Sequence, residues 1–317
     1  MDSIIYFHMN QLGDLLFSLP VLASARKQWP EKRMISVVRP ALAPILKASG
    51  LVDDIVLRPH AGIVAPVRLV ADVRRQHMHM AVLFSQSPAS LITAVMSAIP
   101  RRVGFGSASL SFLLTETVAS SGVPSLENNK NLGIKIGLSE IAEDYTGLVA
   151  IPEVQRIETL RWLGKMFIPT KQLILLSPGA SRRRKDKCWP ADRWATLADQ
   201  LTGSGWHPVF IGAPSERVEL DAIVRLCAIG VPVFCAEKGI LSLVSLIRHA
   251  RVFIGIDSGA MHLAASGGTP VIALFASTDP VQVGPRPLAK HQIIQRDTMD
   301  SITVEDICNV LKNTRVC

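Results

Sequence analysis

The sequence of 317 residues is poor in cysteine, and its cysteines have no spacing that would hold a disulfide scaffold or a zinc finger. They form an odd set without a CxxC pair or a histidine at zinc-ligand spacing: Cys188, Cys227, Cys235, Cys308 and Cys317. We interpret them as small buried apolar residues of a protein in a reducing compartment, and we expect no structural metal.

The sequence also lacks a segment of the kind that directs or anchors a chain to a membrane. Its first ten residues, MDSIIYFHMN, have no basic leader before an apolar run, so we expect no signal peptide. Residues 80–100 carry no charge, but Gln86, Pro88 and several serines interrupt them, which favours a strand followed by a helix over a membrane span. These absences predict a cytoplasmic protein.

What the sequence does contain is an alternation typical of α/β proteins. Hydrophobic residues make up 48% and charged residues 19%, which is enough apolar material for a sizeable core. Short β-rich runs predict strands at Ile4–Phe7, Met34–Val38, Ile55–Leu57, Met80–Phe84, Leu173–Ser177, Pro208–Ile211, Val252–Ile256 and Val271–Phe275. Longer stretches between them predict helices at Leu15–Gln28, 41–49, 64–76, 88–98, 153–168, Ala191–Thr202, Glu216–Cys227, Leu241–His249, Ala260–Ser266 and Val304–Lys312.

This alternation predicts an α/β fold class built from βαβ units around parallel sheets. The length favours two domains, and the pattern weakens between residues 105 and 150 before it restarts after Pro152. We therefore place the domains at 1–152 and 153–317. Because parallel sheets bind ligands beyond the carboxyl ends of their strands, two such sheets facing each other would form a cleft between the domains.

The net charge of +8 arises from one region of the chain. Residues 26–102 hold twelve lysines and arginines against four carboxylates, while the charges of the other residues cancel. A basic balance predicts an anionic partner, which leaves nucleic acid, an acidic lipid surface and a phosphorylated substrate open.

The first motif with chemical potential is Gly13-Asp14, just after the first expected strand. Gly13 allows a tight turn, and Asp14 comes near the amino end of the next helix. A carboxylate at this place either caps the helix or faces the cleft as a general base. The local sequence leaves both interpretations open.

A second motif begins where the strand Leu173–Ser177 ends. The small residues Pro178-Gly179-Ala180-Ser181 expose backbone N–H groups, and five cations follow within residues 182–187, before Trp189-Pro190 opens a helix. Amides, a helix amino end and a lysine are typical of a phosphate-binding loop, although the GxxxxGK[ST] spacing of a P-loop is absent. A solvated basic loop is one alternative. A nucleic-acid patch is another, disfavoured because no aromatic residues are interleaved for base stacking.

The third motif, Asp257-Ser258-Gly259, joins a buried strand to a helix whose first amides can hold an anion. His262 follows one turn later. Alternatively, Asp257 is only a helix N-cap and His262 a core histidine. Ser258 is not in a GxSxG elbow, so we expect no hydrolase chemistry. The next strand ends at Phe275 and is followed by polar residues at the same edge, among them Ser277, Thr278 and Asp279.

Together these segments resemble the lipopolysaccharide heptosyltransferases of glycosyltransferase family 9. The motifs that carry the resemblance run in order over nearly the whole chain: Gly13-Asp14 with Pro20, Arg102-Val103-Gly104-Phe105, Ser177-Pro178-Gly179-Ala180 with Lys187 and Trp189-Pro190, Gly212-Ala213-Pro214 with Glu216, Asp257-Ser258-Gly259 with His262, and Phe275 with Thr278-Asp279-Pro280. The motifs of the second half are the more specific ones.

The resemblance implies a GT-B architecture of two Rossmann-like domains, with the acceptor on 1–152, the nucleotide-sugar on 153–317 and a terminal helix that can pack back on the first domain. It implies an inverting transfer of L-glycero-D-manno-heptose from ADP-heptose to the lipopolysaccharide core, without metal or cofactor. The absence of a DxD motif agrees with a metal-free site. The implied partners are ADP-heptose, the lipid A-core acceptor and, peripherally, the anionic cytoplasmic face of the inner membrane, but no nucleic acid.

Carried over residue by residue, the resemblance makes Asp14 the catalytic base, Lys187 the phosphate-binding lysine and Glu216 the ribose-binding acid. Asp257 matches the aspartate at the sugar and phosphate end of the donor site. The other donor-binding residues that it implies are Ser181, Ser258, Gly259, Ala260, His262 and Thr278. The acceptor-binding candidates, on weaker motifs, are Gly13, Arg101 and Arg102.

Departures from the family pattern leave alternatives. The family loop usually carries one or two basic residues before its lysine, whereas residues 182–185 are all basic here, so Lys185 rivals Lys187. Ala276 stands where glycine is common. A same-fold transferase with another nucleotide-sugar donor, or a non-catalytic nucleotide or polyanion binder, would share the fold. The basic stretch 26–102 either attracts lipopolysaccharide phosphates and anionic lipid or is ordinary solvated charge.

Overall fold

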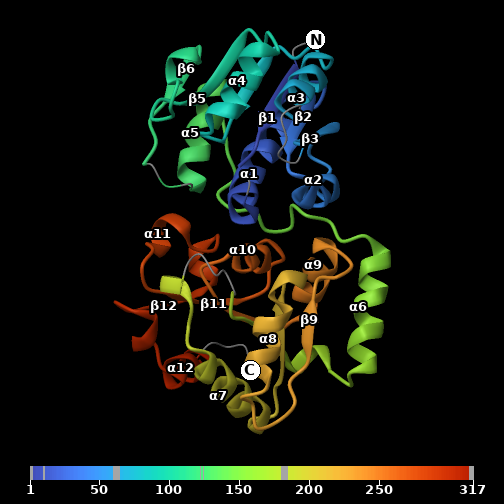
Figure 1. Cartoon of the computed structure of the whole chain (residues 1–317), viewed down its shortest axis with the longest axis vertical. Helices are drawn as coiled ribbons and strands as arrows, with labels where there is room; N and C mark the ends of the chain where they lie inside the picture. The colour runs from blue at the N-terminus through green and yellow to red at the C-terminus, as the bar shows by residue number, and fades with distance from the viewer. Residues whose placement is uncertain are drawn as a thin grey trace. The chain divides into compact units, whose positions relative to one another are not determined.

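The computed structural model of this chain describes residues 3–9, 11–59, 65–121, 123, 125–179 and 185–313. The chain divides into two compact units, Met1–Ala150 and Ile151–Cys317 (Figure 1). Each unit is built around one six-stranded sheet in which every pair of neighbouring strands is parallel. The predicted α/β class with parallel sheets is therefore confirmed.

The sheet of the first unit has the strand order β3-β2-β1-β4-β5-β6. Its strands are β1 (Ser3–Phe7), β2 (Arg33–Val38), β3 (Asp54–Leu57), β4 (Met80–Leu83), β5 (Arg101–Phe105) and β6 (Glu116–Val118). Its helices are α1 (Leu12–Gln28), α2 (Ala43–Ser49), α3 (Ala65–Arg74), α4 (Pro88–Met96) and α5 (Leu126–Ile136), with the short 3-10 helices η1 (Pro40–Leu42) and η2 (Ser111–Leu113). Helices α3 and α4 pack on each other and share one core with Ile5 and Phe7 of β1, while α1 packs against α5.

The sheet of the second unit has the order β12-β11-β10-β7-β8-β9. Its strands are β7 (Leu173–Ser177), β8 (His207–Gly212), β9 (Val233–Cys235), β10 (Val252–Ile256), β11 (Val271–Phe275) and β12 (Gln292–Gln295). Its α-helices are α6 (Glu153–Lys165), α7 (Ala191–Gly203), α8 (Arg217–Val224), α9 (Ile240–His249), α10 (Gly259–Ser266), α11 (Pro280–Val283) and α12 (Val304–Asn313). Its 3-10 helices are η3 (Thr170–Gln172), η4 (Lys185–Lys187), η5 (Pro214–Glu216), η6 (Leu288–Lys290) and η7 (Met299–Ser301).

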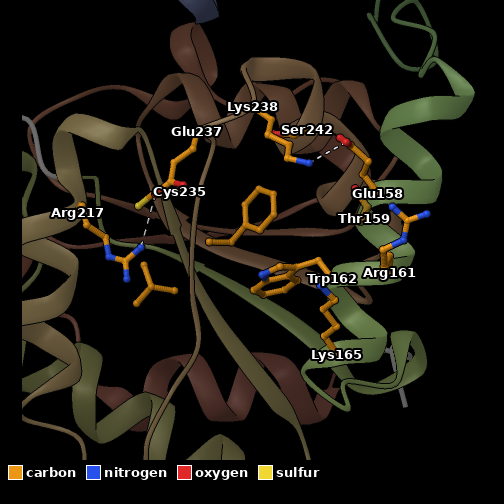
Figure 2. Close-up of a pocket in the computed structure, with 12 residues that line it drawn as sticks. Glu158, Thr159, Arg161, Trp162, Lys165, Arg217, Cys235, Glu237, Lys238 and Ser242 are labelled. Atoms are coloured by element: carbon orange, nitrogen blue, oxygen red, sulfur yellow. Dashed lines mark hydrogen bonds and ion pairs between the residues drawn. The ribbon is translucent and has the colours of Figure 1, made fainter.

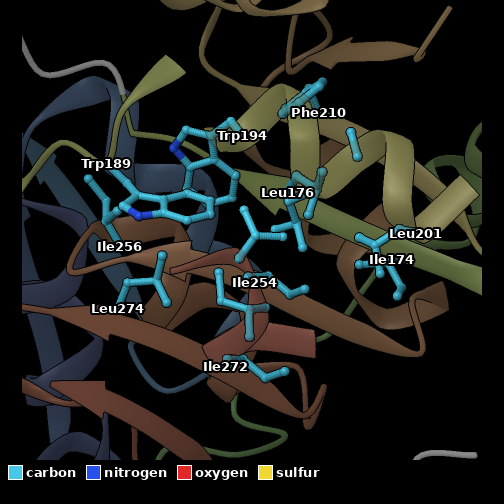
Figure 3. Close-up of a cluster of buried hydrophobic side chains, with 14 of the residues drawn as sticks. Ile174, Leu176, Trp189, Trp194, Leu201, Phe210, Ile254, Ile256, Ile272 and Leu274 are labelled. Carbon is cyan, nitrogen blue, oxygen red and sulfur yellow. The ribbon is translucent and has the colours of Figure 1, made fainter. Parts of the chain in front are cut away.

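A pair of tryptophans organises the core of the second unit (Figure 3). The rings of Trp189 and Trp194 meet edge to face with centroids 4.9 Å apart, and the Trp189 indole N–H donates to the Ile302 carbonyl oxygen at 2.9 Å. Strand side chains such as Ile254 and Leu274 belong to the same cluster. Because Trp189 is buried two residues after Lys187, the core fixes the segment that carries this lysine.

The terminal helix α12 packs on its own unit. It contacts α7, β11 and β12, and it buries Ile307 and Leu311 in the cluster around Trp189. The packing back on the first domain that the sequence analysis considered stays a prediction. Its apolar residues recur at helical spacing, so α12 covers the sheet beside α7 with that stripe.

Both sheets have the doubly wound order in which the chain reverses direction beside its first strand. The reversal lies between β1 and β4 in the first unit and between β7 and β10 in the second. Ligands of open parallel sheets bind beyond the carboxyl ends of the strands at such a switch point. The residues that follow these four strands are therefore the first candidates for function.

Three further findings concern the described part of the chain. None of its helices combines the length and the apolar character needed to cross a bilayer. Among these residues, no three histidine, cysteine or acidic side chains gather as metal ligands. Among the described residues no disulfide is formed by Cys188, Cys227, Cys235 or Cys308, and Cys317 lies outside the described residues.

Candidate functional site

Asp14 lies at the switch point of the first unit. Helix α1 begins at Leu12, shortly after β1, and places Asp14 in its first turn, with Gly13 buried behind it. The partial positive charge of a helix amino end favours a carboxylate over a carboxylic acid there. Asp14 lines a narrow cavity with residues that follow β1 and β4 or lie at the end of β5 and in α5: Met9, Phe84, Gln86, Phe105, Asn128 and Asn129.

A buried histidine that the sequence analysis missed supports this turn. His8 follows β1, and its ring nitrogens Nδ1 and Nε2 each lie 2.9 Å from a hydroxyl oxygen, that of Ser18 in α1 and that of Ser36 in β2. Burial, with a smaller contribution from nearby Arg58, lowers the pKa of His8 to about 3. A neutral imidazole thus ties α1 to two strands. The signal in the sequence is a polar residue directly between a buried strand and the Gly-Asp turn.

Arg101 and Arg102, the weaker acceptor-binding candidates, lie apart from Asp14. They begin β5, so they lie at the amino edge of the sheet, opposite the edge that holds Asp14. The Arg101 guanidinium donates to both carboxylate oxygens of Glu116, at 2.6 and 3.3 Å, and Arg102 donates to the carbonyl oxygens of Ile99, Pro100 and Leu113. The structure therefore does not bring these two arginines together with Asp14, and their role in acceptor binding stays a prediction.

At the switch point of the second unit, Lys187 and Asp257 form an ion pair. The same carboxylate oxygen, Asp257 Oδ2, accepts a hydrogen bond from Thr278 Oγ1 at 2.9 Å. Lys187 follows β7, Asp257 follows β10 and Thr278 follows β11, so three adjacent strands deliver one polar cluster. The structure thus brings together three of the predicted donor-binding residues.

The amino end of α10 lies beside this cluster. Its N-cap is Ser258, followed by Gly259 and Ala260, so the first amides of the helix point beyond the sheet. Within the described residues, the buried Ser258 hydroxyl has no hydrogen-bond partner. An unmatched hydroxyl beside a helix amino end and a lysine suits an anionic or hydroxyl-bearing ligand.

His262, one turn into α10, is almost fully buried. Burial lowers its pKa to about 4 despite the opposing effect of Asp257, and Arg286, Lys187 and His291 lower it further. The imidazole is therefore neutral at pH 7, and it contributes shape and hydrogen bonding rather than charge to this end of the site.

Two contacts shape the loop around Lys187. Gly179 has a φ of +62°, and a Cβ built on it would lie 2.6 Å from the Cδ1 atom of Ile256, so any other residue there would be strained. The Ser277 hydroxyl donates to Asp186 at 2.8 Å, which joins the loop to the end of β11. Ser181 lies outside the described residues, as does the side chain of Lys185.

Glu216 closes the 3-10 turn η5 directly after β8. Its carboxylate accepts the Ala213 backbone N–H at 2.7 Å, so one oxygen also holds the turn. Glu216 is partly exposed at the carboxyl edge of the strand beside β7. It therefore lies on the same edge as Lys187, as expected for residues that bind different parts of one nucleotide.

A cavity of about 290 Å³ opens at the edge strand β9, and the sequence analysis did not single out its residues (Figure 2). The rings of Trp162 and Phe234 meet edge to face in it, with centroids 5.0 Å apart. Lys238 pairs with Glu158 at 2.7 Å across its rim, and Arg217 lines the opposite side. Arg217 directly follows Glu216 in the sequence, but none of the described candidate donor-binding residues lines the cavity.

Each unit thus has a doubly wound sheet with polar residues at its switch point, an arrangement typical of Rossmann-like domains that bind nucleotides. The family model for glycosyltransferase family 9 (heptosyltransferase) matches residues 68–312. The chain belongs to this family, and it is a glycosyltransferase.

Relatives and solved structures agree with this assignment. Lipopolysaccharide heptosyltransferase 3 of Escherichia coli K12 is 23% identical over 291 residues, which cover 86% of this chain and 82% of the relative. The E. coli ADP-heptose lipopolysaccharide heptosyltransferase II superposes with a TM-score of 0.82 at 20% identity and 98% coverage of both chains. E. coli heptosyltransferase WaaC with ADP gives 0.78 at 17% identity, covering 98% of this chain and 99% of the other. The predicted GT-B fold is confirmed.

Proposed function

We propose that this protein transfers L-glycero-D-manno-heptose from ADP-heptose to the lipopolysaccharide core with inversion at the anomeric carbon. The observation that carries the proposal is that the two switch points hold groups suited to different parts of the reaction. One holds a carboxylate, Asp14, and the other holds a lysine and a helix amino end suited to phosphate. The relatives named lipopolysaccharide heptosyltransferases support the choice of sugar and acceptor.

Asp14 acts as the general base in this proposal. An acceptor hydroxyl oxygen attacks the anomeric carbon of the heptose while its proton passes to the Asp14 carboxylate, and the bond from that carbon to the phosphate oxygen breaks. The partial positive charge of a helix amino end favours an ionised carboxylate, which is the form that can accept a proton. Base catalysis of this kind contributes roughly 10²–10⁴-fold in rate.

The departing ADP gains negative charge that must be stabilised. Lys187 and the amides at the start of α10 supply positive charge and N–H donors at the same edge of the sheet, so we propose that the site works without a metal ion. Glu216 binds the ribose hydroxyls, and Asp257, Thr278 and Ser258 bind the end of the donor that carries the sugar. We favour Lys187 over Lys185 because Lys187 pairs with Asp257 and keeps the spacing to Trp189-Pro190.

The donor is tested by thermal unfolding with ADP, UDP, GDP and CDP in turn, with EDTA present. A ligand at 100 times its dissociation constant stabilises the native state by about 2.7 kcal/mol, enough to raise the midpoint measurably. We expect a shift with ADP alone, followed by heptose transfer from ADP-heptose in the same buffer. A shift with UDP or GDP instead would assign the fold to another nucleotide-sugar, and a shift that appears only without EDTA would contradict metal independence.

The stereochemistry is tested separately. Proton NMR of the first product formed from ADP-heptose reports whether the new glycosidic bond has inverted configuration. We expect inversion, because a single displacement needs only one base. A retained configuration would require a different mechanism and would exclude the role given to Asp14.

A further inference from the structure

The cavity beside the edge strand β9 contains two aromatic rings that are only half-buried (Figure 2). Trp162 extends into it from α6 and Phe234 from β9, and the two rings meet edge to face. An edge-to-face pair leaves the face of one ring free to stack on a third ring. A flat apolar molecule would therefore remove aromatic surface from water by entering this cavity.

The size and the walls of the cavity restrict what can enter it. Its volume of about 290 Å³ lies near the lower end of small-molecule sites, which span about 300–1,000 Å³. Such a volume admits a molecule of one or two rings and is too small for a helix of a partner protein. One wall is α6, which packs on α9 and buries Leu163, so the cavity is formed by packed elements of the second unit.

Some of the charged groups around the cavity are matched by opposite charges. Lys238 pairs with Glu158 at 2.7 Å. Arg217 pairs with Asp221 at 2.9 Å and lies 3.8 Å from Glu237. Both carboxylates that line the cavity, Glu158 and Glu237, therefore have a cation of their own, and the two cations that face them need no further anion.

Two other cations that line the cavity are not matched. Arg161 and Lys165 are exposed and stand one turn apart on α6, which makes them neighbours on its surface. Within the part of the chain that the structure describes, neither takes part in an ion pair. Trp162 directly follows Arg161, so one helix supplies both cations and an aromatic ring. An anionic group beside the ring would accept charge-assisted hydrogen bonds from both cations.

Thr159 adds a hydroxyl group to the same wall. It lines the cavity and is 2% exposed. Helical threonines such as Thr196 and Thr202 donate to the carbonyl oxygen four residues back, at 2.9 and 2.8 Å. The Thr159 hydroxyl makes no such bond to the residues that the structure describes, and the Gln155 carbonyl oxygen accepts from Ser245 Oγ at 3.2 Å. A buried hydroxyl without a partner beside a cavity suits a polar atom of a ligand.

We propose that this cavity binds a small aromatic anion, a molecule of one or two fused rings that carries a carboxylate or a phosphate group. The rings pack on Trp162 and Phe234, and the anionic group contacts Arg161 and Lys165. None of the described candidate donor-binding residues lines the cavity, so this ligand is distinct from the nucleotide-sugar and binds together with it. The inference goes beyond the proposed function and requires neither heptose nor acceptor.

The experiment is fluorine NMR of the full chain, with its five tryptophans replaced by 5-fluorotryptophan, during titration with 2-naphthoate. The signal that is lost in Trp162→Phe is that of Trp162. A parallel titration uses 2-naphthyl phosphate, and the tighter binding of the two compounds identifies the anionic group. Two further probes each lack one feature: 2-naphthamide is uncharged, and cyclohexanecarboxylate has the charge without an aromatic ring.

We expect at least one of the two aromatic anions to shift the Trp162 signal and to leave the signals of the other tryptophans in place. The variant Arg161→Gln/Lys165→Gln should bind that anion about tenfold more weakly, the factor that two exposed ion pairs contribute together. The wild type should bind 2-naphthamide more weakly by a similar factor. Cyclohexanecarboxylate should bind about fivefold more weakly than 2-naphthoate, because it cannot stack on the rings.

The matched control is Lys171→Gln/Arg225→Gln, which removes two exposed cations of the second unit that do not line the cavity and should bind as the wild type does. A Trp162 signal that moves with neither anion would overturn the proposal. So would equal affinity of the wild type and Arg161→Gln/Lys165→Gln, or an equal loss in the control. Displacement of the bound anion by saturating ADP would also overturn it, because the cavity would then belong to the donor site.

The charge variants alter only exposed side chains, and a thermal midpoint equal to that of the wild type shows that they are folded. Isothermal titration calorimetry gives the same affinities without the assignment from Trp162→Phe, should that variant not fold. Unchanged affinity for the aromatic anion in the presence of ADP supports a separate site. If ADP itself does not bind, the proposed function fails while the result with the aromatic anion stands, so the two failures are distinguishable.

Discussion

Lys187 and Asp257, which are seventy positions apart in the sequence, form an ion pair at the switch point of the second sheet, and Thr278 donates to the same Asp257 oxygen at 2.9 Å. Both ends of the pair follow buried strands, and Trp189 anchors the segment that carries the lysine. The cation is therefore held in place before any donor arrives. A preset charge of this kind stabilises a leaving phosphate without a cost of rearrangement.

The first prediction concerns this lysine. Lys187→Met should raise the dissociation constant for ADP by about ten- to a hundredfold, the range expected for one charged hydrogen bond. Isothermal titration calorimetry measures it directly. Lys185→Met is the matched control and should bind ADP nearly as the wild type does. A larger loss of ADP affinity in Lys185→Met than in Lys187→Met would assign phosphate binding to Lys185.

A second prediction tests Glu216 through the ribose. Glu216→Gln keeps an oxygen for the Ala213 amide, so the η5 turn should remain folded. The variant loses the charged acceptor for a ribose hydroxyl, and ADP affinity should fall by about tenfold. The decisive comparison uses 2′- and 3′-deoxy-ADP. For at least one deoxy analogue, the ratio of its dissociation constant to that of ADP should be larger for the wild type than for the variant. Equal ratios in both proteins would exclude a ribose contact.

A third prediction concerns the backbone of the phosphate loop. Gly179→Ala places a residue with a Cβ at a position of left-handed backbone conformation, and that Cβ lies against Ile256. The free energy of unfolding should therefore fall by about 1–3 kcal/mol. Gly203→Ala, at the end of α7, meets no atom within 4 Å and should be neutral or slightly stabilising. Denaturant titration of both variants gives the free energies. Equal stability of the two would show that the loop adapts.

A fourth prediction follows from the two buried histidines. The native pKa values are about 3 for His8 and about 4 for His262, below the ordinary value of 6.5. Between pH 6.5 and pH 4 the unfolded chain therefore binds more protons than the native one, and stability should fall as the pH falls through this window. Each histidine contributes at most about 1.4 kcal/mol per pH unit. In His8→Asn and in His262→Gln, the free energy of unfolding, measured by denaturant titration at each pH, should depend less steeply on pH. A dependence as steep as that of the wild type would contradict the lowered pKa of the replaced histidine.

The sequence predicted the elements that bury continuous apolar runs. Strands β1, β7, β10 and β11 lie within a residue of their expected bounds, because Val-, Ile- and Leu-rich runs are typical of parallel strands buried on both faces. Strands β5, β6, β9 and β12 were missed: β6 and β9 have only three residues, and polar or charged residues leave β5 and β12 with short apolar runs. Helix α5 was missed because polar residues interrupt its apolar pattern: the buried Asn128 donates through Nδ2 to the Val123 carbonyl oxygen at 2.6 Å.

The candidate site was predictable where a motif follows a strand and not elsewhere. Lys187, Asp257 and Thr278 each come after a buried strand, and parallel pairing brings such positions to one edge. The separation of Arg101 and Arg102 from Asp14 was not predictable, because a run of basic residues does not show which end of a strand it occupies. The role of His8 depends on its contacts with Ser18 and Ser36, and the cavity at Trp162 depends on the contact of this ring with Phe234. These contacts join elements that are distant in the sequence, so no local pattern predicts them.

The measurement that tests the central claim most directly is heptose transfer by Asp14→Asn, with ADP binding measured on the same sample. Asn is nearly the same size but cannot accept the proton of the acceptor hydroxyl. The account predicts a turnover rate lower by about 10²–10⁴-fold, unchanged ADP affinity and normal activity of the control Asp54→Asn. Turnover by Asp14→Asn equal to that of the wild type would contradict the role of Asp14 as the base and, with it, the proposed mechanism.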